Sequence, residues 1–95
     1  MVDFRIHPPG DSVGVATRDL SRGQQAVGRY VDEKEGEDTT VEMAEDVPLG
    51  HKISLVPISK AEEVIEYGVA IGAATAEIEV GKHVHVHNLK GQRWV

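Results

Sequence analysis

The sequence predicts a mainly β fold, a small domain of short strands with at most one or two short helical turns. Short runs rich in Val and Ile alternate with polar residues, which is typical of half-buried strands. Ten glycines and four prolines punctuate the 95 residues at close intervals. No segment carries a long helical period, and only residues 59–66 have a pattern compatible with one or two helical turns. The length suits one domain, which we place at residues 1–91, followed by a tail or linker at 92–95.

The expected strands follow the apolar runs, and the turns follow the glycines and prolines. The acidic run at residues 32–38 is expected to be an exposed loop, which makes residues 39–43 the returning half of a hairpin begun by residues 25–31. The expected strands span residues 2–7, 12–16, 25–31, 39–43, 53–57, 64–67, 69–71 and 80–86.

A short pattern recurs along the chain. Residues 58–64 and 78–84 both read Ile-x-x-small-x-x-Val, and residues 20–26 are a looser third copy. Such a unit makes a tight turn and then enters a strand. Chance similarity is the alternative at this length, because short motifs match by accident often.

Charge and composition exclude several classes of function. The formal net charge is −6, from 16 acidic and 10 basic residues, which argues against a nucleic-acid or membrane-surface partner. The absence of cysteine excludes disulfides and thiolate metal sites. Asp3 and Arg5 interrupt the first residues, so we expect neither a signal peptide nor a membrane span and place the chain in the cytoplasm.

Three histidines near the C-terminus are the strongest chemical signal. His83, His85 and His87 are spaced by two, so in a strand they project from one face while Val84 and Val86 point to the core. Neighbouring histidines would lie about 7 Å apart, so one ion binds two of them easily and three hardly. Neutral imidazole is both a metal ligand and a proton carrier. The alternative is the exposed polar face of an edge strand.

A second group of polar residues lies at Gly50-His51-Lys52, in a turn directly before a predicted strand. His51 can donate, accept or bind a metal, and Lys52 supplies a cation for a carboxylate. The alternative is a pair of ordinary solvated side chains. Asp19 follows the strand that ends at Ala16, and composition alone favours a turn-capping role for it.

These segments also resemble a known family. The runs at residues 11–20, 48–55, 66–72 and 83–88 resemble, in this order, motifs of the SAF-type N-terminal domain of altronate and galactarate dehydratases, which is related to the sulfolactate sulfo-lyase small subunit. Two positions depart from the family pattern. Glu66 stands where the family usually has Lys, which bears on the substrate, and Ala61 stands where it usually has Gly, which bears on a turn.

The resemblance implies a β-clip fold and a part in a hydro-lyase that dehydrates an aldonic or aldaric acid. It implies a small subunit or N-terminal domain, inactive alone, that completes or covers the active site of a large partner. The implied cofactor is a divalent metal, iron(II) or manganese(II), shared with the partner domain. The implied site residues are His51 and Lys52 as catalytic groups, Asp19 and Asn88 for substrate, and His85 and His87 for metal.

Several alternatives remain beside this interpretation. The chain can be the small subunit of a sulfolactate sulfo-lyase, a non-catalytic SAF-type carbohydrate- or protein-binding module, or a piece of a longer enzyme. Exposed strand edges also leave a homo-oligomer open. The dehydratase interpretation predicts that His51 lies close in space to His85 and His87.

Overall fold

The computed structural model describes residues 2–7, 11–31 and 38–91, and these residues form nine β-strands and no helix. The mainly β prediction is therefore confirmed. No described segment is a helix of the length and apolarity that crossing a membrane requires. The strands are β1 (Phe4–Ile6), β2 (Val13–Ala16), β3 (Gln25–Tyr30), β4 (Thr39–Glu42), β5 (Lys52–Ser54), β6 (Glu63–Glu66), β7 (Val69–Ala74), β8 (His83–Val84) and β9 (Leu89–Lys90).

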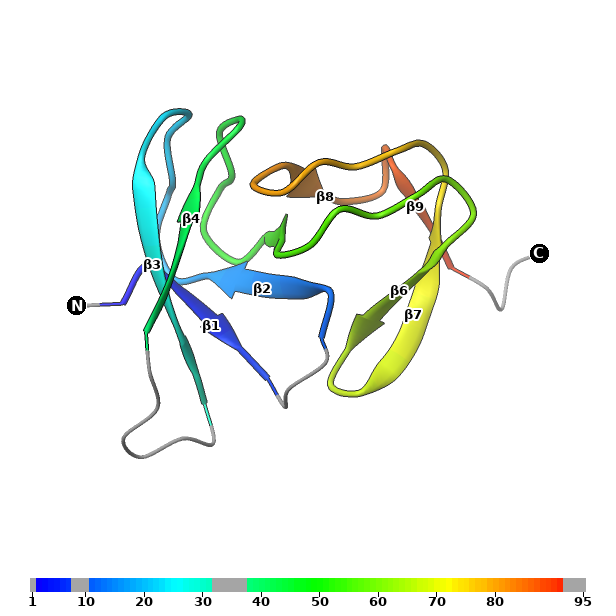
Figure 1. Cartoon of the computed structure of the whole chain (residues 1–95), viewed down its shortest axis with the longest axis horizontal. Coiled ribbons are helices and arrows are strands. Elements are labelled where there is room, and N and C mark those ends of the chain that lie inside the picture. Colours follow the sequence, from blue (N-terminus) through cyan, green and yellow to red (C-terminus); the bar gives the residue numbers. More distant parts are fainter. Residues whose placement is uncertain (1, 8–10, 32–37, 92–95) are drawn as a thin grey trace.

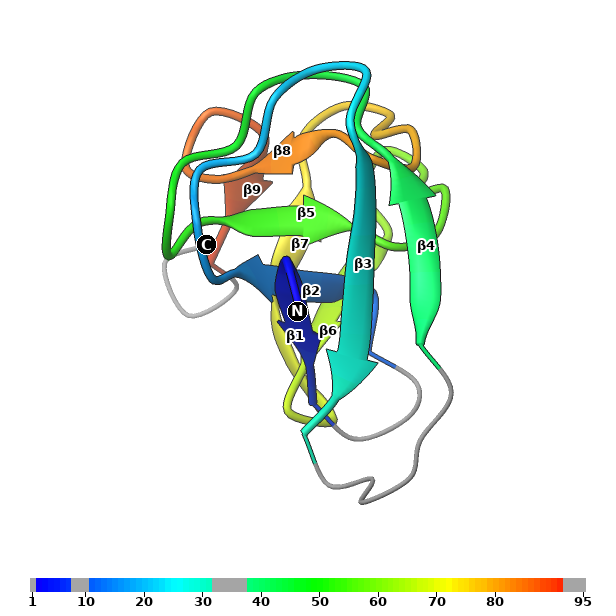
Figure 2. The same ribbon diagram turned by 90° about the vertical axis from the view of Figure 1, so that its left-hand side faces the viewer.

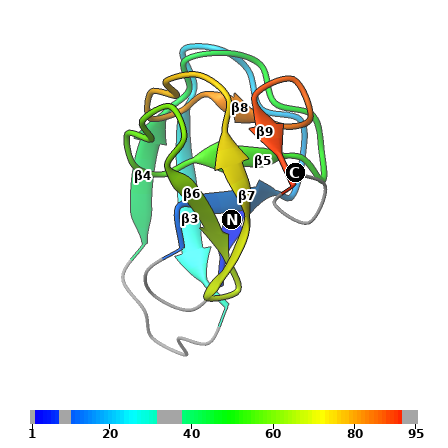
Figure 3. The same cartoon turned by 90° about the vertical axis from the view of Figure 1, so that its right-hand side faces the viewer.

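The described strands form two sheets. The larger sheet has the order β4-β3-β1-β2-β5-β8, and the smaller one has the order β6-β7-β9 (Figure 1). β1 and β3 are parallel, whereas the other paired strands are antiparallel. Figure 2 shows that β3 and β4 run across the direction of β2, β5 and β8, so the larger sheet is strongly curled. Figure 3 shows the smaller sheet from its own side, with β7 between β6 and β9.

One eight-residue backbone pattern occurs four times in the described chain, and we call each copy a clip unit. The clip units are residues 17–24, 44–51, 55–62 and 75–82. In each, the fourth residue makes an isolated bridge with another unit, Leu20 with Val47 and Ile58 with Ile78. The repeat seen in the sequence is therefore real, and it has a fourth copy at residues 44–51 that the sequence prediction missed.

Each clip unit contains a tight turn whose seventh residue has a positive φ, as in a type II turn. These residues are Gly23 (φ 87°), Gly50 (84°), Ala61 (73°) and Gly81 (86°). Their N–H groups donate to a carbonyl at the end of a strand, or one residue beyond it, that lies four residues before the partner unit's bridge residue. The bonds are Gly23 to Met43 (2.8 Å), Gly50 to Ala16 (2.9 Å), Ala61 to Ala74 (2.8 Å) and Gly81 to Ser54 (2.9 Å). In each pair, the turn of one clip unit is therefore hydrogen-bonded to the residue that leads into the other unit, and the reverse.

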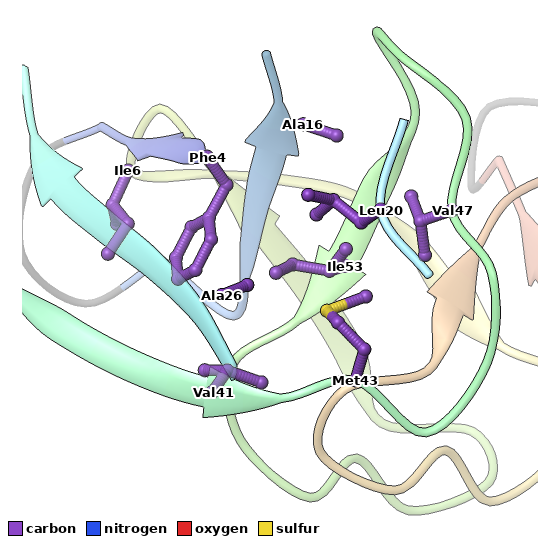
Figure 4. Close-up of a cluster of buried hydrophobic side chains, with 9 residues drawn as sticks. All are labelled: Phe4, Ile6, Ala16, Leu20, Ala26, Val41, Met43, Val47 and Ile53. Carbon is purple, nitrogen blue, oxygen red and sulfur yellow. The ribbon is translucent and has the colours of Figure 1, made fainter. Parts of the chain in front are cut away.

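The buried apolar residues form two clusters, one around each pair of clip units. Figure 4 shows the first cluster, which comprises Phe4, Ile6, Ala16, Leu20, Ala26, Val41, Met43, Val47 and Ile53. The second comprises Val13, Ile58, Val64, Ala74, Ile78 and Val84. β5 and β8 join the two halves, because Ile53 belongs to the first cluster and Val84 to the second.

Two predicted segments near the C-terminus differ from the structure. Residues 59–66 contain no helical turn, because Ala61 completes a clip turn and Glu63–Glu66 form β6. The strand expected at residues 80–86 covers only His83–Val84 (β8), so Val86 is 82% exposed instead of buried.

Asn88 holds the turn that follows β8. Its side chain accepts a hydrogen bond from the His85 N–H at 2.9 Å and donates one to the His83 carbonyl at 2.8 Å. Both backbone groups face away from β5, at the free edge of the sheet, and residues 86–88 turn.

The remaining strand predictions are confirmed in outline. The hairpin of β3 and β4 pairs as expected, while β5 ends at Ser54 and not at residue 57. Most of the predicted acidic loop (residues 32–37), the turn at residues 8–10 and the tail at 92–95 lie outside the described residues.

Candidate functional site

A histidine cluster forms where β5 and β8 pair. The register places Ile53 opposite His83 and Lys52 opposite Val84. One residue further along, the same register brings His51 opposite His85. Since side chains of an antiparallel pair alternate between faces, His51, His83 and His85 all lie on one side. The pairing of two distant segments, and not one long strand, therefore assembles the cluster.

The rings of the cluster are in direct contact. Nδ1 of His51 and Nε2 of His83 are hydrogen-bonded at 2.8 Å. The rings of His51 and His85 stack with centroids 4.3 Å apart, and those of His83 and His85 are 5.5 Å apart. His87 contacts the His83 ring at 5.2 Å. The expected proximity of His51 to His85 is thus confirmed.

The surroundings of His83 and His85 favour the neutral form of these two imidazoles. Burial lowers the pKa of His83 below its ordinary value, and the neighbouring His51, His87 and His85 lower it further, against an opposing effect of Glu45. The pKa of His85 is also lowered, first by desolvation and then by His51, Lys52 and His87. Crowded imidazoles resist protonation because each positive charge repels the next.

The backbone on which these histidines lie is held by side chains. The Glu45 carboxylate accepts a hydrogen bond from the His83 N–H at 2.7 Å. Asn88 bonds both the His85 N–H and the His83 carbonyl, as described above. The structure therefore gives Asn88 a positioning role in the cluster, while its predicted contact with substrate stays a prediction. Sequence reasoning missed Glu45, since nothing local links it to His83.

Lys52 follows His51 in the chain and connects the two sheets, and its charge reaches the cluster, since it lowers the pKa of His85. Its Nζ is 3.9 Å from a carboxylate oxygen of Glu66, whose side chain is only 11% exposed. The turn after Glu66 is fixed by Asp11, whose carboxylate accepts the N–H groups of Tyr67 at 2.8 Å and Gly68 at 3.0 Å. The predicted cation is thus present, but it already faces an internal anion at a position where the family pattern suggested Lys.

Asp19 serves the clip unit that carries His51. Its carboxylate accepts the Leu49 N–H at 2.9 Å, inside the turn that precedes His51. Asp46 makes the reciprocal contact, accepting the Arg22 N–H at 2.9 Å in the partner unit. This is the turn-capping role that composition favoured, and a contact of Asp19 with substrate stays a prediction.

The fifth histidine of the chain lies in different surroundings. His7 packs on Tyr67 with ring centroids 3.5 Å apart, and its buried Nδ1 has no hydrogen-bond partner among the described residues. Because the ring contacts of His7 in the described chain are with Tyr67 and not with the cluster, His7 provides a matched control for experiments on the cluster.

The clip units, the two sheets and the histidine cluster define a strand-only domain of SAF type. Residues 3–92 match the family described as the altronate/galactarate dehydratase SAF domain. The chain belongs to this family. The match covers and extends the segments whose motifs predicted it.

Known relatives occur in two architectures. The (2R)-sulfolactate sulfo-lyase subunit alpha of Chromohalobacter salexigens is 38% identical over 96 residues, covering 98% of both chains. The altronate dehydratase of Escherichia coli is 42% identical over 80 residues, covering 84% of this chain and 14% of that enzyme. The altronate dehydratase of Bacillus subtilis is 34% identical, covering 92% of this chain and 16% of the enzyme. The chain therefore spans about one seventh of the altronate dehydratases.

Proposed function

We propose that this chain is the small subunit, or the equivalent domain, of a lyase that eliminates a leaving group from a hydroxy acid. It contributes one half of an active site, formed by the histidine cluster and Lys52, and a larger lyase polypeptide contributes the other half. The main supporting observation is that two distant segments bring His51, His83 and His85 together. Lys52 is the next residue after His51, and its charge acts on His85.

The residues suit an elimination next to a carboxylate. Such a reaction removes a proton from the carbon beside the carboxylate and expels a group from the next carbon. An imidazole takes or delivers a proton near neutral pH. The Lys52 ammonium attracts the carboxylate and stabilises the enolate-like charge that develops on it. His51 and Lys52 are therefore the proposed catalytic groups of this chain.

A larger partner is part of the proposal, because the described residues leave the site incomplete. In the described chain, the carboxylate paired with Lys52 belongs to the nearly buried Glu66, and that of Glu45 is engaged by the His83 N–H. Substrate selection therefore needs groups from elsewhere. The sulfo-lyase relative is called a subunit, and the altronate dehydratases extend far beyond the matched region.

The experiment is co-expression with the large lyase subunit, followed by a screen of altronate, galactarate and sulfolactate. We expect turnover of one of these acids by the complex and none by the purified chain alone. The His51→Ala variant should assemble and lose most of the activity, while His7→Ala retains it. Turnover by the isolated chain, or an active His51→Ala complex, would contradict the proposal.

The same screen separates the two candidate lyases. The end-to-end match to a sulfo-lyase subunit favours sulfolactate, whereas the matches to altronate dehydratases favour a sugar acid. Both reactions are eliminations beside a carboxylate, so the half-site described here serves either. A complex that binds an acid without converting any would favour a non-catalytic binding module instead.

A further inference from the structure

We propose that His51, His83 and His85 bind one divalent transition-metal ion, that this chain does so without its partner, and that His87 lies outside the ligand set. The sequence alone suggested His85 and His87 as ligands, with His51 as a separate catalytic group. The inference concerns the site of the proposed function, but ion binding is measured without turnover, so the two can fail separately.

The ligand atoms are already at a suitable spacing. Nitrogen ligands lie about 2.1 Å from an ion, which separates two of them by about 3.0 Å at a right angle and about 3.4 Å in a tetrahedron. Nδ1 of His51 and Nε2 of His83 are 2.8 Å apart. One potential ligand atom from each of His51, His83 and His85 lies within 4.8 Å of the other two. Small rotations of the rings close the remaining difference.

The three ligands are also held in place before an ion arrives. His51 leaves the Gly50 turn opposite His85, and the β5–β8 pairing fixes the distance between the two segments. Glu45 and Asn88 hold the backbone N–H groups of His83 and His85. A preformed set loses less conformational entropy on binding than three independent surface histidines would.

His87 differs from the other three histidines of the cluster. It is exposed and follows the highly exposed Val86 in the turn that ends the cluster. It touches the His83 ring, but it is not part of the group whose ligand atoms converge. The His87 imidazole would therefore lie beside the ion without binding it, where it is available to contact substrate or to transfer a proton.

The donor set selects the class of ion. Three imidazoles suit zinc, iron(II), nickel or copper, while calcium and magnesium prefer oxygen ligands. Three protein ligands leave coordination positions open, as in catalytic and not in structural sites. When bound, such an ion supplies a Lewis acid for an oxygen of the acid substrate. In that state His51 serves as a ligand, and its loss would reduce activity through the ion.

The test is calorimetric titration of the untagged, metal-free chain with Zn²⁺, supported by the visible spectrum of the Co²⁺ form. We expect one ion per chain. His51→Ala, His83→Ala and His85→Ala should each weaken binding at least about tenfold, because removing even an outer-shell partner of a metal ligand costs about 10–100-fold in affinity. His87→Ala and His7→Ala should bind as the unchanged chain does.

Circular dichroism identifies any variant that fails to fold, and such a variant is replaced by the His→Gln substitution at the same position. Unchanged Zn²⁺ affinity in folded variants of His51 would overturn the assignment. Loss of Zn²⁺ binding in His87→Ala, with binding retained in His51→Ala, would instead indicate His85 and His87 as the ligands. The complex could lack lyase activity while its small chain still binds one ion through His51, His83 and His85. That result would refute the proposed function but not the metal site.

Discussion

At the scale of single residues, one backbone conformation explains how the clip units form. Three of the four clip turns place Gly at the position of positive φ, where a Cβ is disfavoured, and the fourth places Ala61 there with φ 73°. Ala61 keeps the same turn and the same hydrogen bond to Ala74 as the glycines make in their units. The departure from the family pattern at this position therefore changes the strain of a turn and not its shape.

Ala61→Gly is expected to raise the free energy of unfolding by about 1 kcal/mol, because the left-handed region costs a non-glycine residue about that much. The greater freedom of glycine in the unfolded chain offsets part of the gain. Urea denaturation measures the change. Gly23→Ala is the matched control, since a Cβ there meets no atom within 4 Å, and it should destabilise by a similar amount. A less stable Ala61→Gly chain would contradict this account.

The histidine cluster gives the metal-free chain a pH-dependent stability. Burial lowers the pKa of His83 and His85 from the ordinary 6.5, so below that pH the unfolded chain binds more protons than the folded chain. The free energy of unfolding should therefore fall as the pH drops below about 6.5, and level off below the folded-state pKa values.

Denaturation curves collected between about pH 7.5 and pH 5.5, on either side of the ordinary histidine pKa, measure this slope. The double variant His83→Gln, His85→Gln should show a flatter dependence, since Gln does not titrate. An equal slope in both chains would assign the pH dependence to other groups.

At the scale of elements, the sequence predicts the strands better than it predicts their ends. Alternation locates β1, β3 and β4 because each has one clearly buried face, whereas β2 is found as a short apolar run. The strand expected at residues 80–86 is reduced to His83–Val84, and Asn88 bonds two backbone groups in the turn that follows, a contact that no periodicity reveals. The clip unit at residues 44–51 was missed although Val47-x-x-Gly50-x-x-Ile53 fits the repeat that the other copies define.

The candidate site was predictable only in part for the same reason. The spacing of the histidines suggested a cluster, but the partners of each ring depend on the β5–β8 register, which a single sequence does not specify. The link between Lys52 on β5 and Glu66 on β6 joins two sheets and is equally invisible from local patterns.

The Lys52–Glu66 pair makes a prediction about substrate binding in the active complex. In the proposed active site, Glu66 would compete with the substrate carboxylate for Lys52, so Glu66→Gln should lower KM several-fold and change kcat less, in line with the strength of ordinary charged contacts. Glu77→Gln, at an exposed carboxylate, carries the same change in net charge and should leave KM unchanged. A higher KM in Glu66→Gln would indicate that Glu66 positions Lys52 for the substrate.

At the scale of the whole molecule, exposed apolar side chains lie close in sequence to the histidines of the cluster. Val86 is 82% exposed directly after His85, and Leu49 is 61% exposed two residues before His51. Exposed apolar side chains next to polar catalytic groups are typical of a surface that another chain covers. The larger polypeptide of the proposed lyase is the natural partner, because its half of the active site must meet this face.

Val86→Asp should weaken assembly with the large subunit by roughly tenfold or more, since a buried apolar anchor often contributes over 1 kcal/mol and an unpaired buried charge costs further. Analytical ultracentrifugation of the mixed subunits measures the effect. Val69→Asp on β7, where Val69 is 62% exposed, is the control that should assemble normally. Equal weakening by both substitutions would place the partner on another face.

The most direct test of the half-site is an add-back titration of this chain into a fixed amount of the large subunit, with lyase activity as the readout. Activity should rise from the background to saturation at one chain per large subunit. The Lys52→Met chain should bind equally well without restoring activity. Full activity of the large subunit alone, or full restoration by Lys52→Met, would contradict the claim that this chain supplies half of the active site.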